Sequence, residues 1–123
     1  MNIFGKEYGF QLTIGASDAI GKVCRDGDIA NMGELLSGGT YSETVSALCV
    51  MAIAMNDGYR LNRKIFYDIN NDPVLTRDHI MALNPADIDH LIREVTEAIN
   101  QGMERSVIAE SIQGKNDHSE ATA

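Results

Sequence analysis

The sequence predicts an α+β fold that is mostly α, with an N-terminal β-hairpin packed on four to five helices. Apolar and polar residues alternate over residues 8–14, as in a half-buried strand. Further along, several segments carry apolar residues at helical spacing, each preceded by a capping residue. The length of 123 residues suits one domain with a single modest core.

The N-terminal hairpin is predicted over residues 3–8. Gly5-Lys6 fits a two-residue loop with glycine at its first central position, where φ is positive. The strand that follows places one row of apolar side chains on a single face: Tyr8, Phe10, Leu12 and Ile14. A hairpin alone is marginal in water, so it must pack on helices or on a third strand. A short C-terminal strand over residues 105–108 is the candidate for that third strand.

Capping residues mark the first three predicted helices. Ser17 is expected to cap a short helix that ends near residues 25–27, and Asp28 or Asn31 to start a second that breaks at residues 37–39. Residues 40–43 (TYSE) match a capping box, and the third helix that they open is expected to run to about Gly58.

The C-terminal half is predicted to hold two more helices. Thr76 caps a short one, and Asn84-Pro85 starts a longer one. Gly102 is expected to end that longer helix, whose apolar stripe is Ile88, Leu91, Ile92, Val95 and Ile99. Residues 114–123 (GKNDHSEATA) have nothing to bury, so we expect a globular domain over residues 1–113 and a disordered polar tail over 114–123.

The third helix is apolar on nearly all sides, since Ser46 is the one polar residue between Val45 and Met55. Such a helix is normally covered by protein on both sides. In so small a domain the second cover can come from another chain. We therefore hypothesise a partner-binding or self-association surface, with internal core as an equally good interpretation, formed by Ala47, Val50, Met51 and Ala54.

Composition limits the possible functions. Ten Lys and Arg against 18 Asp and Glu give a net charge of −8, and the sequence pI is near 4.7. This balance argues against binding of nucleic acid through its phosphates. No apolar run is long enough for a membrane span, and the N-terminus lacks a secretory signal pattern, so we expect a cytoplasmic protein. Cys24 and Cys49 fit buried, reduced thiols.

Three clusters of polar and charged residues are candidates for a metal-binding or nucleic-acid-binding site. Asp68, Asn70 and Asp72 have the spacing of a calcium loop, but proline replaces its glycine and a histidine replaces its last glutamate. Asp87 and His90, with His79 nearby, fit helix-dipole compensation better than a metal site. Basic residues with interleaved aromatics fit a solvated, ion-paired face better than a nucleic-acid site: Arg60, Arg63, Lys64, Tyr59, Phe66 and Tyr67. We therefore expect no catalytic, cofactor or metal site, and no enzyme.

Both ends of the chain resemble phage tail assembly chaperones, the small tail proteins of long, flexible-tailed phages and prophages of Gram-positive bacteria. Residues 3–16 (IFGKEYGFQLTIGA) are similar to the hairpin that opens that family. Residues 83–91 (LNPADIDHL) and 98–103 (AINQGM) are similar to its C-terminal helix, whereas residues 57–76 match loosely.

The resemblance implies a non-enzymatic assembly factor in the bacterial host cytoplasm. Members of the family bind the long helical tape measure protein, keep it soluble and recruit major tail tube protein subunits. A structural tail or head–tail completion protein that stays in the virion is the alternative. A small metal-dependent enzyme and a nucleic-acid-binding regulator rank below both, and a homo-oligomer is compatible with the apolar third helix.

Overall fold

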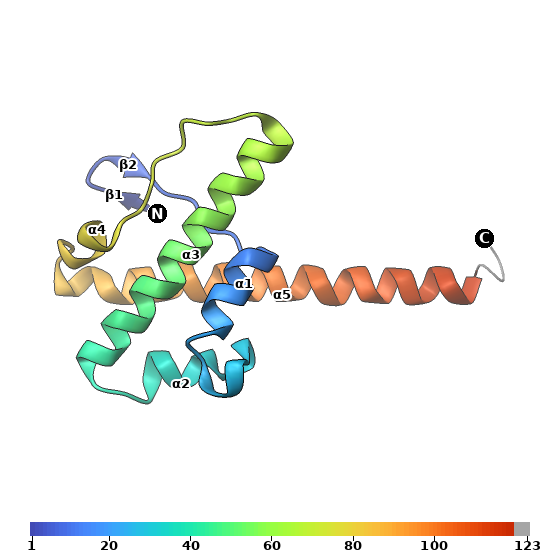
Figure 1. The fold of residues 1–123 in the computed structure, drawn as a ribbon, viewed down its shortest axis with the longest axis horizontal. Helices are drawn as coiled ribbons and strands as arrows, with labels where there is room; N and C mark the ends of the chain where they lie inside the picture. Colours follow the sequence, from blue (N-terminus) through green and yellow to red (C-terminus); the bar gives the residue numbers. More distant parts are fainter. Residues whose placement is uncertain (120–123) are drawn as a thin grey trace.

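The computed structural model describes the backbone of residues 1–119 and the side chains of residues 1–104. The predicted fold class is confirmed: a two-stranded antiparallel sheet at the N-terminus packs on a mostly helical body (Figure 1). The strands are β1 (Asn2–Ile3) and β2 (Lys6–Glu7). The helices, apart from short 3-10 turns, are α1 (Ile14–Gly21), α2 (Met32–Ser37), α3 (Tyr41–Tyr67), α4 (Arg77–Met81) and α5 (Ile88–Ser119).

The core lies where the two long helices, α3 and α5, cross (Figure 1). α1 packs along α3 more extensively than any other helix, and α2 packs on α3 as well. α4 contributes one buried side chain, that of Ile80. The largest fully buried side chains of the three main helices are Ile20, Leu48, Met51, Met55, Leu91, Val95 and Ile99.

The hairpin turn lies one residue earlier than predicted. Ile3 pairs with Lys6, so the two-residue loop is Phe4-Gly5 rather than Gly5-Lys6. Both loop residues have positive φ, 50° and 83°, as a type I′ turn requires. The side-chain oxygen of Asn2 accepts a hydrogen bond from the N–H of Gly5 at 3.2 Å, which holds this turn.

The alternating segment after the hairpin is not a sheet strand. Residues 8–13 belong to neither a strand nor a helix. The backbone of Tyr8 pairs with Met1, and residues of α3 supply partners for Gly9 and Gln11. The N–H of Gln11 donates to the carbonyl of Met55 at 3.0 Å, and the amide of Asn56 donates to the carbonyl of Gly9 at 3.1 Å. The predicted strand is therefore wrong, although Tyr8 is buried as the alternation indicated.

Two glycines expected near helix ends instead lie inside long helices. α3 continues past Gly58 to Tyr67, and α5 continues past Gly102 to Ser119. A Cβ on Gly58 would lie 2.6 Å from the hydroxyl of Thr13, and one on Gly102 would lie 2.6 Å from Leu12. Both glycines therefore allow residues 8–13 to pack closely on the two helices. They are required for this packing and do not end the helices.

Most predicted helix starts are confirmed. Asp28, Thr40 and Thr76 each accept a backbone hydrogen bond at the start of a helical segment. Pro85 opens a 3-10 turn that leads into α5. The predicted cap of α1 is wrong: Thr13 caps it and accepts from the N–H of Ala16 at 3.1 Å, so Ser17 lies inside the helix.

The C-terminal strand prediction is also wrong. Residues 105–108 are part of α5, which extends beyond the body of the molecule (Figure 1), so they cannot join the hairpin. Residues 114–119 of the expected tail continue α5, and residues 120–123 lie outside the described residues. No described helix combines the length and apolarity needed to cross a bilayer.

Candidate interaction surface

The hypothesised partner face of α3 is covered by the same chain over part of its area. Ala47 and Met51 are buried, at 8% and 0% exposure, so both belong to the core. Val50 and Ala54 are half-buried. Because α1, α2 and α5 all pack on α3, the same chain can supply the second covering layer, as the alternative interpretation of internal core requires. The four residues thus do not form one exposed face.

The exposed apolar part of α3 lies nearer its C-terminal end, in the turns that follow Gly58. There the helix passes beyond the core, and four large hydrophobic side chains are more than half exposed. The exposed fractions are 55% for Leu61, 64% for Ile65, 72% for Phe66 and 68% for Tyr67. Neighbouring exposed hydrophobics of this kind are typical of interaction sites.

We call Arg60, Leu61, Lys64 and Ile65 the α3 surface. Leu61 and Ile65 are separated by four residues, as are Arg60 and Lys64, so each pair lies on one side of the helix. The surface therefore carries an apolar row beside a basic row. Phe66 is five residues from Leu61, which turns it away from this row at 100° per residue.

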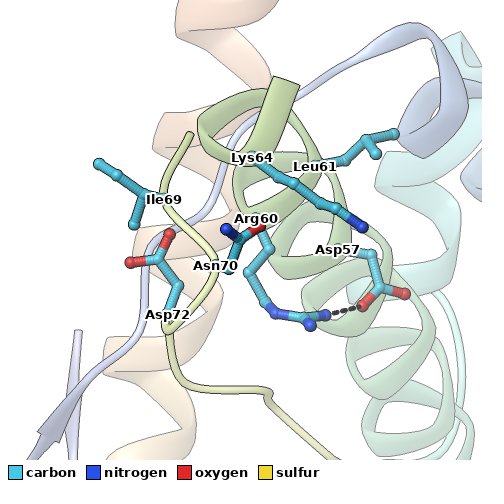
Figure 2. A pocket seen from close by; sticks show the side chains of 7 residues that line it. All are labelled: Asp57, Arg60, Leu61, Lys64, Ile69, Asn70 and Asp72. Atoms are coloured by element: carbon cyan, nitrogen blue, oxygen red, sulfur yellow. Dashed lines mark hydrogen bonds and ion pairs between the residues drawn. The ribbon is translucent and has the colours of Figure 1, made fainter. Parts of the chain in front are cut away.

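A groove follows the α3 surface on one side. It has a volume of about 400 Å³ and lies between the last turns of α3 and the segment that returns from it. Figure 2 shows the α3 side chains on one side of this groove and those of the returning segment on the other. The lining residues are Asp57, Arg60, Leu61, Lys64, Ile69, Asn70 and Asp72.

An ion pair fixes the returning segment against α3. The guanidinium Nε of Arg63 donates to Asp72 at 2.6 Å, and Arg63 also lies over the ring of Tyr59, 5.2 Å from its centroid. The hydrogen bond to Asp72 is the main cause that raises the pKa of Arg63 above its ordinary value. Asp68 ends the helix in the left-handed conformation, φ 54°, which aspartate tolerates better than most residues. The pair therefore ties the returning segment, which forms one wall of the groove, to α3, which forms the other.

The basic residues of this region differ in their partners. Arg63 is held by Asp72, while Arg60 makes a longer contact of 3.4 Å with Asp57 on its own helix. Lys64 has no ion-pair partner among the described residues. The interpretation of the cluster as a solvated, ion-paired face thus fits all three residues, because Arg60 and Arg63 are paired and Lys64 is exposed.

The other sequence candidates have separate structural roles. His79 completes the capping box of α4 with Thr76 and packs on the ring of Tyr8, with ring centroids 5.6 Å apart. His90 contacts Glu94 on the next turn at 3.3 Å. Within the described residues, no three His, Cys, Asp or Glu side chains gather in a way that suits a metal ion.

Sequence analysis missed Asn56, the one polar side chain in the described part of the chain that is buried. Its amide donates to Gly9, and its oxygen accepts from the N–H of Leu75 at 3.0 Å. Asn56 therefore joins the N-terminal segment to the segment that leaves the groove. A single asparagine after a long apolar run was the available signal.

The residues that carry the family resemblance pack against one another. Leu12, in the first resembling stretch, contacts Gly102 in the last, and Tyr8 shares a shallow depression with Ala98 and Gln101. These motifs are therefore structural here. No protein-family model matches the chain, and neither does any curated protein or solved structure.

Proposed function

We propose that the chain is a non-enzymatic phage tail assembly chaperone, which binds the tape measure protein and helps to recruit tail tube subunits in the bacterial host cytoplasm. The proposal rests on the resemblance of residues 3–16, 83–91 and 98–103 to that family. It is the function that best suits a small acidic body with a helix whose last turns carry exposed apolar side chains.

The observation that carries the proposal is the exposed row of Leu61 and Ile65 at the end of α3. A long helical client exposes apolar stripes before assembly, and a chaperone must cover such stripes with apolar surface of its own. Because Arg63 and Asp68 fix this end of the helix, it offers that surface in an ordered form.

Co-expression tests the proposal. The chain is produced together with a tape measure protein, and the amount of soluble tape measure protein is quantified with and without the chain. We expect the client to become soluble and to co-purify. A client that is equally soluble alone, or that never co-purifies, contradicts the proposal.

Mass analysis of purified phage particles separates the proposal from its alternative. A chaperone is absent from finished particles, whereas a structural tail or head–tail completion protein is present in stoichiometric amount. Detection of the chain in mature virions would therefore favour the alternative.

A further inference from the structure

We infer that the backbone edge of residues 8–12 binds an extended, basic segment of another protein as an added strand. One edge of this segment is paired with α3, and the opposite edge carries free backbone groups along a groove. The site shares no residue with the α3 surface. It suits any partner that offers such a segment, so its test does not depend on the proposed function.

Alternate residues of this segment pair with α3. The carbonyl of Gly9 accepts a hydrogen bond from the side-chain amide of Asn56 at 3.1 Å. Two residues later, the N–H of Gln11 donates to the carbonyl of Met55 at 3.0 Å. In an extended chain the backbone groups of alternate residues point to the same edge, so residues 9 and 11 serve the edge that faces α3.

The opposite edge begins with one strand-like pair and then has no further partner. Tyr8 and Met1 exchange two hydrogen bonds, of 2.9 and 2.8 Å, which continue the β1–β2 ladder by one pair. Among the described residues, neither the N–H nor the carbonyl of Phe10 or Leu12 makes a hydrogen bond. These four groups follow the Tyr8–Met1 pair at the spacing of a strand edge.

Free groups in this register select an extended partner. An added strand can pair with each of them through its own backbone, as in other cases where a peptide joins the edge of a sheet. A helical partner cannot do so, because its interior N–H and carbonyl groups are already bonded to each other. The backbone edge therefore decides the conformation of the partner.

A groove gives access to the free edge. Two depressions, of about 430 and 260 Å³, follow the segment from Tyr8 to Leu12, and residues of α5 line them on the other side. The two depressions adjoin, because they share four lining residues, and we call them together the edge groove. The shared residues are Phe10, Tyr59, Ala98 and Gln101.

The charged side chains of the edge groove are all acidic. No Lys or Arg is among its described lining residues, whereas three glutamates are: Glu7, Glu94 and Glu97. The N-terminal amine of Met1 is paired with Glu7 at 2.9 Å, so these two charges compensate each other. Glu94 contacts His90 at 3.3 Å and Glu97 contacts the amide of Gln101 at 3.4 Å, and neither contact places a Lys or Arg beside them. With −8 on the whole chain, the groove favours Lys or Arg on the added strand.

The same carboxylates disfavour a second copy as the occupant. If two copies paired symmetrically through this edge, their edge grooves would meet, and Glu94 and Glu97 of both copies would lie at one interface. Like charges placed in this way oppose association. We therefore expect the added strand to come from a different protein.

Synthetic peptides test the backbone pairing. The parent peptide alternates lysine with valine, and two derivatives are N-methylated, one at every lysine and the other at every valine. Both derivatives keep the charge of the parent, but each loses the N–H groups of one edge. The full chain is used without residues added before Met1, because such residues could continue β1 along the free edge.

Fluorescence anisotropy in about 0.1 M salt measures the three affinities. We expect one derivative to bind like the parent and the other to bind at least about tenfold more weakly, because only one edge of the added strand faces residues 8–12. Equal affinities of the two derivatives mean that charge alone is recognised, and they overturn the inference. The absence of binding by the parent peptide also overturns it.

Matched charge variants locate the binding site. Glu97→Lys is compared with Glu104→Lys, which makes the same change at an exposed position of α5 that does not line the edge groove. Glu104 lies seven residues further along the helix, a rise of about 10 Å, over which salt screens much of its charge. We expect Glu97→Lys to weaken the parent peptide at least about fivefold and Glu104→Lys less than about twofold. Circular dichroism and thermal unfolding establish that both variants are folded, and equal effects of the two overturn the inference.

Sedimentation velocity tests the alternative occupant. We expect the unchanged chain to sediment as a monomer both with and without the parent peptide. A dimer that the peptide dissociates overturns the inference, because the free edge would then serve a second copy.

Discussion

Replacing Asn56 with alanine tests how the groove is held together. Its side chain makes a buried hydrogen bond to the N–H of Leu75 and a partly buried one to the carbonyl of Gly9. The substitution leaves both backbone groups without these partners. An orphaned buried group costs about 2 kcal/mol and a partly buried one about 1 kcal/mol.

Alanine has a higher helix propensity than asparagine, which offsets about 0.6 kcal/mol of this loss in the free energy of unfolding. The net expected loss is therefore about 2 to 3 kcal/mol in the free energy of unfolding. In urea, with a slope of about 1.5 kcal/mol per M, the unfolding midpoint falls by about 1.3 to 2 M.

Asn100→Ala is the matched control, because it makes the same change at an exposed position of α5. We expect it to leave the midpoint unchanged or to raise it slightly. Urea unfolding followed by circular dichroism measures both variants. If Asn56→Ala is no less stable than Asn100→Ala, then Asn56 does not join the two segments and the reasoning is wrong.

Three further predictions concern other parts of the fold. Gly58→Ala should destabilise the chain by about 1 to 3 kcal/mol, because its Cβ would lie 2.6 Å from a neighbouring side chain, whereas Gly33→Ala meets open space and should be neutral or stabilising; urea unfolding distinguishes them. The hydrogen bond from Arg25 lowers the pKa of Glu34, so this pair stabilises the fold above the ordinary carboxyl pKa and loses that effect as pH falls through the lowered value. Carboxyl NMR titration should show the Glu34 pKa return to its ordinary range in Arg25→Gln, and an unchanged value contradicts the pairing. Burial raises the pKa of the Cys49 thiol, so thiol reagents should label it slowly at neutral pH until denaturant is added; rapid labelling of the native chain would contradict its burial.

Local signals in the sequence predicted the helix starts well. Thr40 and Thr76 cap their helices through hydrogen bonds within a few residues, which a local pattern can encode. The alternation also indicated that Tyr8, Phe10 and Leu12 face the core. It was wrong for Ile14, which is 92% exposed because α1 begins there and the alternation ends. Such patterns report backbone conformation and burial, because both depend on neighbouring residues.

Signals that depend on distant residues were misinterpreted. Gly58 and Gly102 resemble helix ends, yet each is required by a segment far away in the sequence that packs on it. The alternating segment cannot reveal whether its partner is a strand or a helix, since both leave one face buried. The burial of Ala47 and Met51 depended in the same way on how the other helices pack on α3.

The end of α3 combines two properties that stability alone does not require together. Leu61 and Ile65 remain more than half exposed, so most of their apolar surface brings no hydrophobic stabilisation to the isolated chain. At the same time the Arg63–Asp72 pair and the two hydrogen bonds of Asn56 hold the surrounding backbone in place. Apolar side chains that are both exposed and rigidly presented gain their stabilisation only when another molecule covers them. The end of α3 is therefore a better candidate for an interaction site than its buried middle.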